Sequence, residues 1–228
     1  MFFIRSRRNF STLTATALLF VTLPALVHAS PKREDSKHLG LVSGNRREES
    51  LLRARSRAIA LLREENACSA WFRGSVDDPA AVFQSLQFKV TADEHTYISR
   101  VAGSHDIMTF YKHPWAARSW QLAGPNSTVL LNNGGAFFNS SSPVVELNHQ
   151  GGFSRYLGFR MLTIGPFKGS TSEAQITTLL HELGHVTDRI PEDDDSWDGK
   201  SSRNTEEVLR HCKSDIQEFA KRDIAERE

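Results

Sequence analysis

Residues Gln175 to Asp188 have the sequence QITTLLHELGHVTD, and the expected fold is organised around this stretch. It contains the pattern H-E-x-x-H at residues 181–185. Residues four apart on an α-helix lie nearly above one another, so His181 and His185 can reach one zinc ion at Zn–N distances of about 2.0–2.1 Å. Glu182 lies beside the first histidine, where it can take a proton from a water molecule on the metal. The pattern therefore predicts a zinc site with a general base.

The residues around this pattern predict a buried helix. Ser170 and Glu173 are spaced as a capping box, in which each side chain satisfies a free backbone N–H at the helix start. Gly184 costs roughly 1 kcal/mol relative to alanine inside a helix, so we expect another backbone, such as a sheet strand, to pass close to it. Apolar residues follow at helical spacing on either side of the histidines: Ile176, Leu179, Leu180, Leu183 and Val186.

Two histidines on a helix can also be ordinary core residues that hydrogen-bond to their neighbours. The neighbours of this pair are apolar, however, and a buried glutamate between two buried histidines is costly without a partner. A bound metal ion supplies such a partner. The composition of the helix therefore favours a metal site over an accidental match to the pattern.

The third ligand of the metal matches no standard spacing in this chain. A catalytic zinc usually has three protein ligands and one water molecule. Asp193 follows His185 by eight residues, at a place where a turn can bring its carboxylate back to the metal. Glu206, on the next expected helix, is the alternative third ligand. Asp188 and Asp194 are further candidates.

The first 29 residues have the features of a secretory signal. A basic start precedes an apolar run from Ala15 to Val27, and the small residues that follow predict cleavage after Ala29. The run is too short for a transmembrane span, so we expect no stable membrane insertion once the signal is removed. Residues 6–10 (SRRNF) also resemble a twin-arginine export signal, and both export routes stay open. The expected location is periplasmic or extracellular.

The remaining chain of about 200 residues is long enough for one hydrophobic core. Residues 30–50 are polar and lack periodicity, which predicts a mobile leader, and residues 51–228 then form a single domain. The formal charge is +1, from 28 basic and 27 acidic residues. This balance argues against nucleic acid or an anionic membrane as the main partner.

Cys68 and Cys212 are the two cysteines of the chain. An even pair in an exported protein predicts a disulfide, here one that ties the N-terminal region to the C-terminal helix. In the loop-entropy model, closing so long a loop stabilises the fold by about 4–5 kcal/mol. Two free buried thiols are the alternative.

Periodicity predicts helices at both ends of the domain and strands between them. The first helices are expected at residues 51–66 and 78–86, the second with Asp78 and Pro79 at its N-cap and N1 positions. Strand patterns follow at residues 88–92, 96–101, 107–111, 128–138 and 144–147, the fourth interrupted by an Asn-Gly turn. The order predicts an α+β fold with a mostly antiparallel sheet.

Asn204 is the expected N-cap of the C-terminal helix. Four residues of this helix share one face, which places Cys212 in the core: Val208, Cys212, Ile216 and Phe219.

The motif, preceded by Ile-Thr-Thr-Leu-Leu, is similar to the extended motif of the zincin metallopeptidases. The wider pattern also includes Cys68, residues 130–138 (LLNNGGAFF), residues 202–205 (SRNT) and Cys212. It resembles a group of small exported bacterial proteins taken to be zinc metallopeptidases. The resemblance implies a zincin-like fold, with a twisted sheet packed on the motif helix. It also implies that the strand at 128–131 or 136–138 offers an edge to an extended substrate peptide.

The expected function is therefore hydrolysis of peptide bonds in a peptide or protein substrate, with Zn2+ as cofactor and Glu182 as general base. Tyr156 and His211 are candidates for stabilising the oxyanion, and each also has an ordinary structural explanation. Two alternatives stay open: another kind of zinc amide hydrolase, and a non-catalytic exported protein with a structural metal or none. Peptide deformylase is the best-known H-E-x-x-H amide hydrolase, but Cys68 does not sit in the ligand context of that family.

Overall fold

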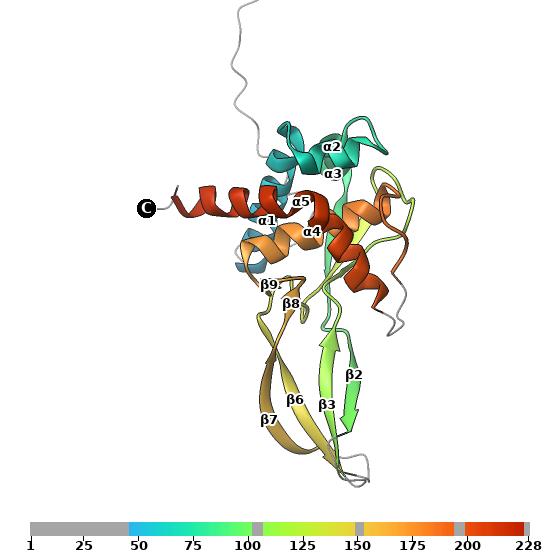
Figure 1. Ribbon diagram of the computed structural model, residues 1–228. Coiled ribbons are helices and arrows are strands. Elements are labelled where there is room, and N and C mark those ends of the chain that lie inside the picture. Colours follow the sequence, from blue (N-terminus) through green and yellow to red (C-terminus); the bar gives the residue numbers. More distant parts are fainter. Residues whose placement is uncertain (1–45, 102–106, 149–152, 194–198, 226–228) are drawn as a thin grey trace, which may run out of the picture. The chain divides into compact units, whose positions relative to one another are not determined.

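The computed structural model describes residues 46–101, 107–148, 153–193 and 199–225 (Figure 1). The expected signal and most of the expected leader lie outside these ranges. The described helices are α1 (Arg46–Arg63), α2 (Ala67–Arg73), α3 (Pro79–Ser85), α4 (Ser172–Val186) and α5 (Lys200–Ala225). Together with nine strands they confirm the α+β class.

The strands form three sheets. The first has the order β1-β5-β4, from β1 (Gln87–Thr91), β5 (Thr128–Asn132) and β4 (Ala117–Arg118). The second has the order β2-β3-β6-β7, from β2 (His95–Val101), β3 (Ile107–Pro114), β6 (Ser141–Asn148) and β7 (Phe153–Met161). The third pairs β8 (Thr163–Ile164) with β9 (Phe167–Lys168). Figure 1 shows the long strands of the four-stranded sheet extending away from the helices.

The expectation of mostly antiparallel pairing is confirmed, because five of the six described strand pairings are antiparallel. The expectation of one sheet is wrong, since the strands are divided among three sheets. The parallel exception is β1 with β5, where Phe88 lies opposite Val129. A parallel pair needs a crossover connection, and here the connection contains β2, β3 and β4. Alternation along the chain predicts that a strand exists but does not reveal its partner.

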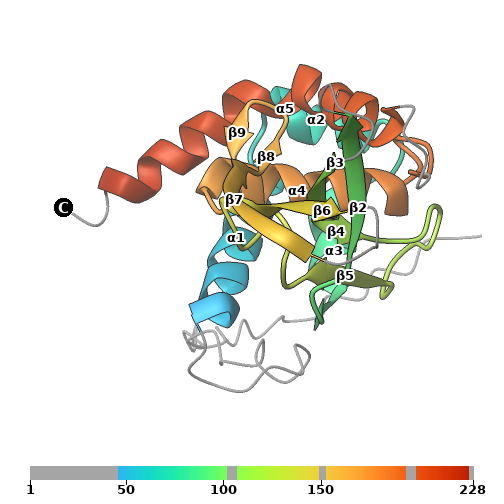
Figure 2. The ribbon, with the colours of Figure 1, turned by 90° about the horizontal axis from the view of Figure 1, so that it is seen from below.

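Helix α4 lies in the centre of the hydrophobic core. It contacts α1 and α5, and in Figure 2 α1 runs across the direction of α4. Every residue from Ala174 to Val186 is buried. The five apolar residues expected to face the core are among them, and a fully buried leucine or isoleucine contributes about 1.5–3 kcal/mol.

The starts of two helices differ from the expectation. The N-cap of α4 is Thr171, whose Oγ1 accepts a hydrogen bond from the backbone N–H of Ala174 at 3.3 Å. Ser170, the expected cap, has φ +67° and donates its backbone N–H to Ala136 instead. Helix α1 begins at Arg46 rather than Leu51, so the last five residues of the expected leader are helical. Acidic residues in its first turn favour this earlier start through the helix dipole.

Residues 133–139 form turns rather than the second half of a hairpin. A Cβ atom at Gly135 would lie 2.2 Å from the Trp115 carbonyl oxygen, so the chain packs here too closely for another side chain. Phe137 is fully buried in the core. Strand β5 is also the central strand of its sheet. No described strand therefore offers the expected edge at 136–138, and β4 covers the expected edge at 128–131 where it pairs with Leu130 and Leu131.

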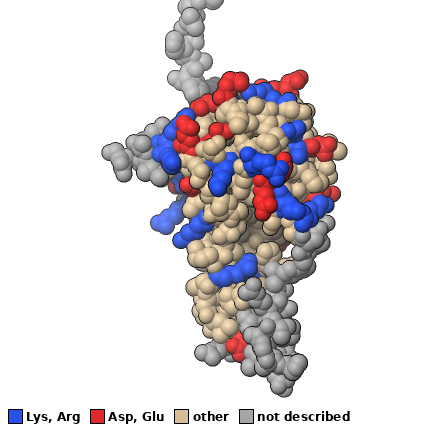
Figure 3. Space-filling model, in the orientation of Figure 1, with Lys and Arg blue, Asp and Glu red and all other residues tan. Residues whose placement is uncertain are grey.

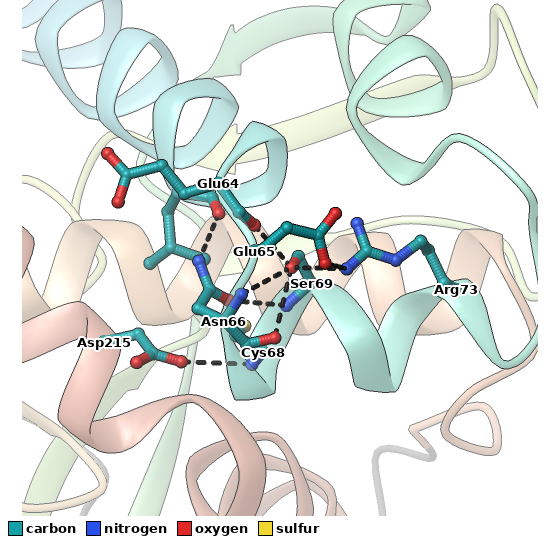
Figure 4. A network of polar contacts seen from close by, with 8 residues as sticks. Glu64, Glu65, Asn66, Cys68, Ser69, Arg73 and Asp215 are labelled. Atoms are coloured by element: carbon teal, nitrogen blue, oxygen red, sulfur yellow. Dashed lines mark hydrogen bonds and ion pairs between the residues drawn. The ribbon is translucent and has the colours of Figure 1, made fainter.

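The predicted disulfide between Cys68 and Cys212 is confirmed, and it joins α2 to α5. Helix α2 was not expected from the sequence. Asn66 begins it with a capping box, in which Asn66 and Ser69 each bond to the other's backbone N–H (Figure 4). Asp215 of α5 accepts a hydrogen bond from the Cys68 backbone N–H at 3.0 Å. The junction of α2 and α5 is thus held by a covalent bond and a polar contact.

The face of the molecule in Figure 3 carries basic and acidic side chains interspersed over the helical part. The part formed by β6 and β7 carries few charges in that view. Four large apolar residues of β7 are exposed: Tyr156, Leu157, Phe159 and Met161. Among the described helices, none is both long and apolar enough to cross a membrane.

Candidate metal centre

Helix α4 brings the two histidines of the motif together. The Nε2 atoms of His181 and His185 lie 3.0 Å apart, and the rings meet edge to face with centroids 4.7 Å apart. Both residues are buried, with exposed fractions of 5% and 3%. The spacing of four residues on a helix accounts for this geometry.

The chain turns back immediately after α4. The carbonyl oxygen of Gly184 accepts hydrogen bonds from the backbone N–H groups of Arg189 (2.8 Å) and Ile190 (3.3 Å). A Cβ at Gly184 would lie 2.9 Å from two carbon atoms of the Ile190 side chain. The expectation of a neighbouring strand at Gly184 is therefore wrong, because the close contact is made by this side chain. The glycine lets the turn close on the helix.

The turn delivers a carboxylate to the histidines. Oδ2 of Asp193 lies 3.0 Å from Nε2 of His181, and Oδ1 lies 3.6 Å from Nε2 of His185. One ligand atom from each of the three residues falls within 4.8 Å of the others. Asp193 is half-buried, with 30% of its side chain exposed.

The other candidates for a third ligand are placed elsewhere. Glu206 is exposed on α5 and does not belong to the group. Asp188 is exposed, and its Oδ1 accepts a hydrogen bond from Gln121 at 2.7 Å. Asp194 lies outside the described residues. The described chain thus places one acidic residue, Asp193, against the two histidines.

The chemistry of this group fits a metal ion. Two imidazole nitrogens and a carboxylate converge, which is a donor set that binds divalent transition metals. Two buried atoms beside it, Oε2 of Glu182 and Nδ1 of His185, have no hydrogen-bond partner within the described part of the chain. A buried carboxylate oxygen without a partner is costly, and a nearby cation offsets that cost.

The electrostatics of the group are strongly coupled. Burial lowers the pKa of His181, but its hydrogen bond to Asp193 and the charges of Glu182 and Asp193 outweigh burial and raise this pKa. Burial raises the pKa of Glu182 above its usual value, although both histidine charges oppose the shift. For Asp193 burial acts upward, and the hydrogen bonds to both histidines hold its pKa far below the usual range. In the metal-free group, the charged forms of His181 and Asp193 therefore stabilise each other.

Two residues of α5 also contact the group, and one of them was expected to have a different role. Asn204 is not the N-cap of α5, which starts at Lys200. Its side chain donates to Oδ1 of Asp193 at 2.6 Å and to the Pro191 carbonyl at 2.8 Å. Oγ1 of Thr205 lies 3.1 Å from Nδ1 of His181. Neither residue has a spacing from the motif that indicates this role.

A segment following β4 borders the other side of α4. Oγ of Ser119 donates to the Glu182 carbonyl at 3.2 Å, and the Leu122 backbone N–H donates to the His185 carbonyl at 3.0 Å. Leu122 has φ +54° and is 68% exposed, and Trp120 is 72% exposed. This segment was not expected from the sequence, because its contacts with α4 span more than sixty residues of chain.

The two oxyanion candidates have structural surroundings of their own. Tyr156 is exposed on β7 and packs edge to face against Phe159. His211 stacks on Trp71 and hydrogen-bonds to Glu207. Neither belongs to the group of His181, His185 and Asp193.

No family model, no curated protein and no solved structure matches this chain. The interpretation of the site therefore depends on the geometry of its own residues.

Proposed function

We propose that this protein is an exported zinc-dependent peptidase. The observation that carries the proposal is the convergence of His181, His185 and Asp193 on one point, beside the buried carboxylate of Glu182, whose Oε2 has no hydrogen-bond partner among the described residues. The disulfide between Cys68 and Cys212 supports export, because such bonds persist in oxidising compartments outside the cytosol.

The number and type of ligands favour a catalytic metal. Structural zinc sites usually have four protein ligands, whereas catalytic sites have three and an open position. The group contains three ligand residues among those described, and Asp193 is partly exposed to solvent. Two histidines and one carboxylate also bind Fe(II) in oxygenases. The adjacent acid Glu182 favours hydrolysis, since hydrolysis requires a base at the metal.

Zinc, when bound, lowers the pKa of a coordinated water molecule towards about 7 and polarises the carbonyl group under attack. Glu182 accepts the proton of the attacking water and passes it to the leaving nitrogen of the substrate. Burial raises the pKa of Glu182, which favours its protonated form, while positive charge beside it favours the ionised form that a base needs. The Ser119 hydroxyl fixes the backbone at Glu182, because it donates a hydrogen bond to the Glu182 carbonyl oxygen.

The test is the substitution Glu182→Gln, which keeps the size of the side chain and removes its ability to accept the proton. We expect hydrolysis of casein or a fluorogenic peptide mixture to fall by about 10²–10⁴-fold, the usual contribution of a general base. Metal analysis should find one zinc per chain in both the variant and the wild-type protein.

Glu206→Gln is the matched control, because Glu206 is an exposed glutamate of α5 outside the group. This variant should retain full activity. A Glu182→Gln protein that binds zinc and keeps wild-type activity contradicts the proposed role of Glu182. A wild-type protein that binds no zinc contradicts the cofactor.

A further inference from the structure

Asn204 occupies a place where a helix gains nothing from asparagine. It lies in the second turn of α5 and is 5% exposed, and asparagine is among the weaker helix formers. Both hydrogen bonds from its amide nitrogen go to the turn after α4, at Pro191 and Asp193. The bond to Asp193 engages Oδ1 and leaves Oδ2 directed at His181. The side chain thus fixes the orientation of the carboxylate.

Thr205, the next residue of α5, contacts a second member of the group. Its Oγ1 lies 3.1 Å from Nδ1 of His181, while Nε2 of the same ring faces Asp193 and His185. A histidine that binds a metal through Nε2 carries its proton on Nδ1, and an acceptor there sets the tautomer and the ring orientation. The Thr205 hydroxyl oxygen can accept a hydrogen bond from the Nδ1–H group of His181.

The support is uneven among the three residues. Nδ1 of His185 has no hydrogen-bond partner within the described residues. The ring of His185 contacts His181 and Asp193 through Nε2, and its backbone position is set by the buried helix α4. His181 and Asp193 also have contacts with α5, through Thr205 and Asn204. Helix α5 follows the motif helix along the chain after the turn and residues 194–198.

We propose that Asn204 and Thr205 form a positioning pair that sets the metal affinity of the site. The pair orients the Asp193 carboxylate and the His181 ring from one dipeptide of α5. This inference rests on the proposed function in so far as it requires a metal at His181, His185 and Asp193. Loss of such supporting contacts typically weakens metal binding by about 10–100-fold.

The experiment compares metal affinity in variants of the full-length protein. Thr205→Val removes the hydroxyl and keeps the shape of the side chain, Thr205→Ser restores the hydroxyl, and Asn204→Ala removes the amide. The dissociation constant for Zn2+ is measured by competition with a chromophoric chelator, and the visible spectrum of bound Co2+ reports the ligand geometry. We expect Thr205→Val and Asn204→Ala to bind Zn2+ about 10–100-fold more weakly and to change the Co2+ spectrum. Thr205→Ser should bind like the wild type.

Thr178→Val is the matched control for the loss of a hydroxyl. Thr178 is buried on α4, and its Oγ1 donates within the helix to the Ala174 carbonyl at 2.8 Å, outside the metal group. This variant should bind Zn2+ like the wild type. Equal Zn2+ affinity in wild type, Thr205→Val and Asn204→Ala overturns the proposal. Should Asn204→Ala fail to fold, the valine and serine variants of Thr205 decide the matter alone.

The same measurements separate this proposal from the peptidase proposal. Weaker metal binding in Thr205→Val supports the positioning pair even where Glu182→Gln leaves activity intact, which contradicts only the catalytic role. A wild-type protein that binds neither Zn2+ nor Co2+ overturns both.

Discussion

Helices α4 and α5 build the same site in different ways. Helix α4 is buried from Ala174 to Val186 and supplies both histidines and the candidate base. Helix α5 is longer and buries one face, from which Asn204 and Thr205 reach the group. Helix α4 therefore supplies the two histidines from inside the core. Helix α5 contacts His181 and Asp193 through Thr205 and Asn204.

The contrast indicates that the two halves of the site have different sources of rigidity. The position of the histidines follows from the packing of α4 in the core, which single side chains on the surface do not alter. The position of Asp193 depends on contacts with α5, and α5 is in turn fastened to α2 by the disulfide. Three experiments probe these two halves separately, in order of decreasing effect.

Removing the disulfide breaks the fastening of α5. The double substitution Cys68→Ala and Cys212→Ala opens a loop with a sequence separation of 144 residues. The loop-entropy model predicts a fall in the free energy of unfolding of about 4–5 kcal/mol, measured by urea denaturation of the metal-free protein. Reductant should lower the stability of the wild type towards that of the variant and leave the variant unchanged. Equal stability of the oxidised wild type and the variant contradicts the idea that α5 needs this anchor.

Titration probes the charge on α4. His181 has a raised pKa, so in the metal-free protein it still holds its proton at and above the usual value of 6.5. A metal ion needs the neutral ring and must displace that proton. We therefore expect Zn2+ affinity to increase with pH above 6.5, by up to about tenfold per unit, until His181 is neutral. Chelator competition at several pH values measures the slope. An affinity that is constant between pH 6.5 and 8 is the contrary result.

The N-cap of α4 gives the smallest effect. Thr171→Ala removes the hydroxyl that accepts from the Ala174 N–H, and we expect it to lower the free energy of unfolding by about 1 kcal/mol. Ser170→Ala is the control, because Ser170 does not cap the helix, and it should change stability by less than about 0.5 kcal/mol. Denaturant unfolding of both variants measures the difference. A larger loss of unfolding free energy for Ser170→Ala than for Thr171→Ala would support the capping box expected from the sequence.

The same contrast explains how much of the site the sequence could predict. His181, Glu182 and His185 form a local pattern whose geometry follows from the period of a helix. Asp193 could be named as a candidate because it follows His185 by only eight residues. The roles of Asn204 and Thr205 depend on where α5 packs, and no local spacing encodes that position.

For the fold, the sequence predicted the class, the disulfide and five of the nine described strands, and it missed β4, β7, β8 and β9. It failed where tertiary contacts decide the outcome. The Asn-Gly pair after β5 favours a hairpin, but Phe137 is drawn into the core and the chain turns instead. The parallel pairing of β1 with β5 joins segments forty residues apart and leaves no mark on either strand's alternation.

The four-stranded sheet consists of two hairpins, β2–β3 and β6–β7. In each hairpin the first and the last residue lie close together. Asn132 holds both ends of the first, since its side chain bonds to the Glu94 backbone and its N–H to the Ala116 carbonyl. The Leu162 N–H bonds to the Ser140 carbonyl at the ends of the second. Lengthening or shortening both hairpins together would therefore leave these junction hydrogen bonds in place, and with them the course of the backbone that carries the metal ligands.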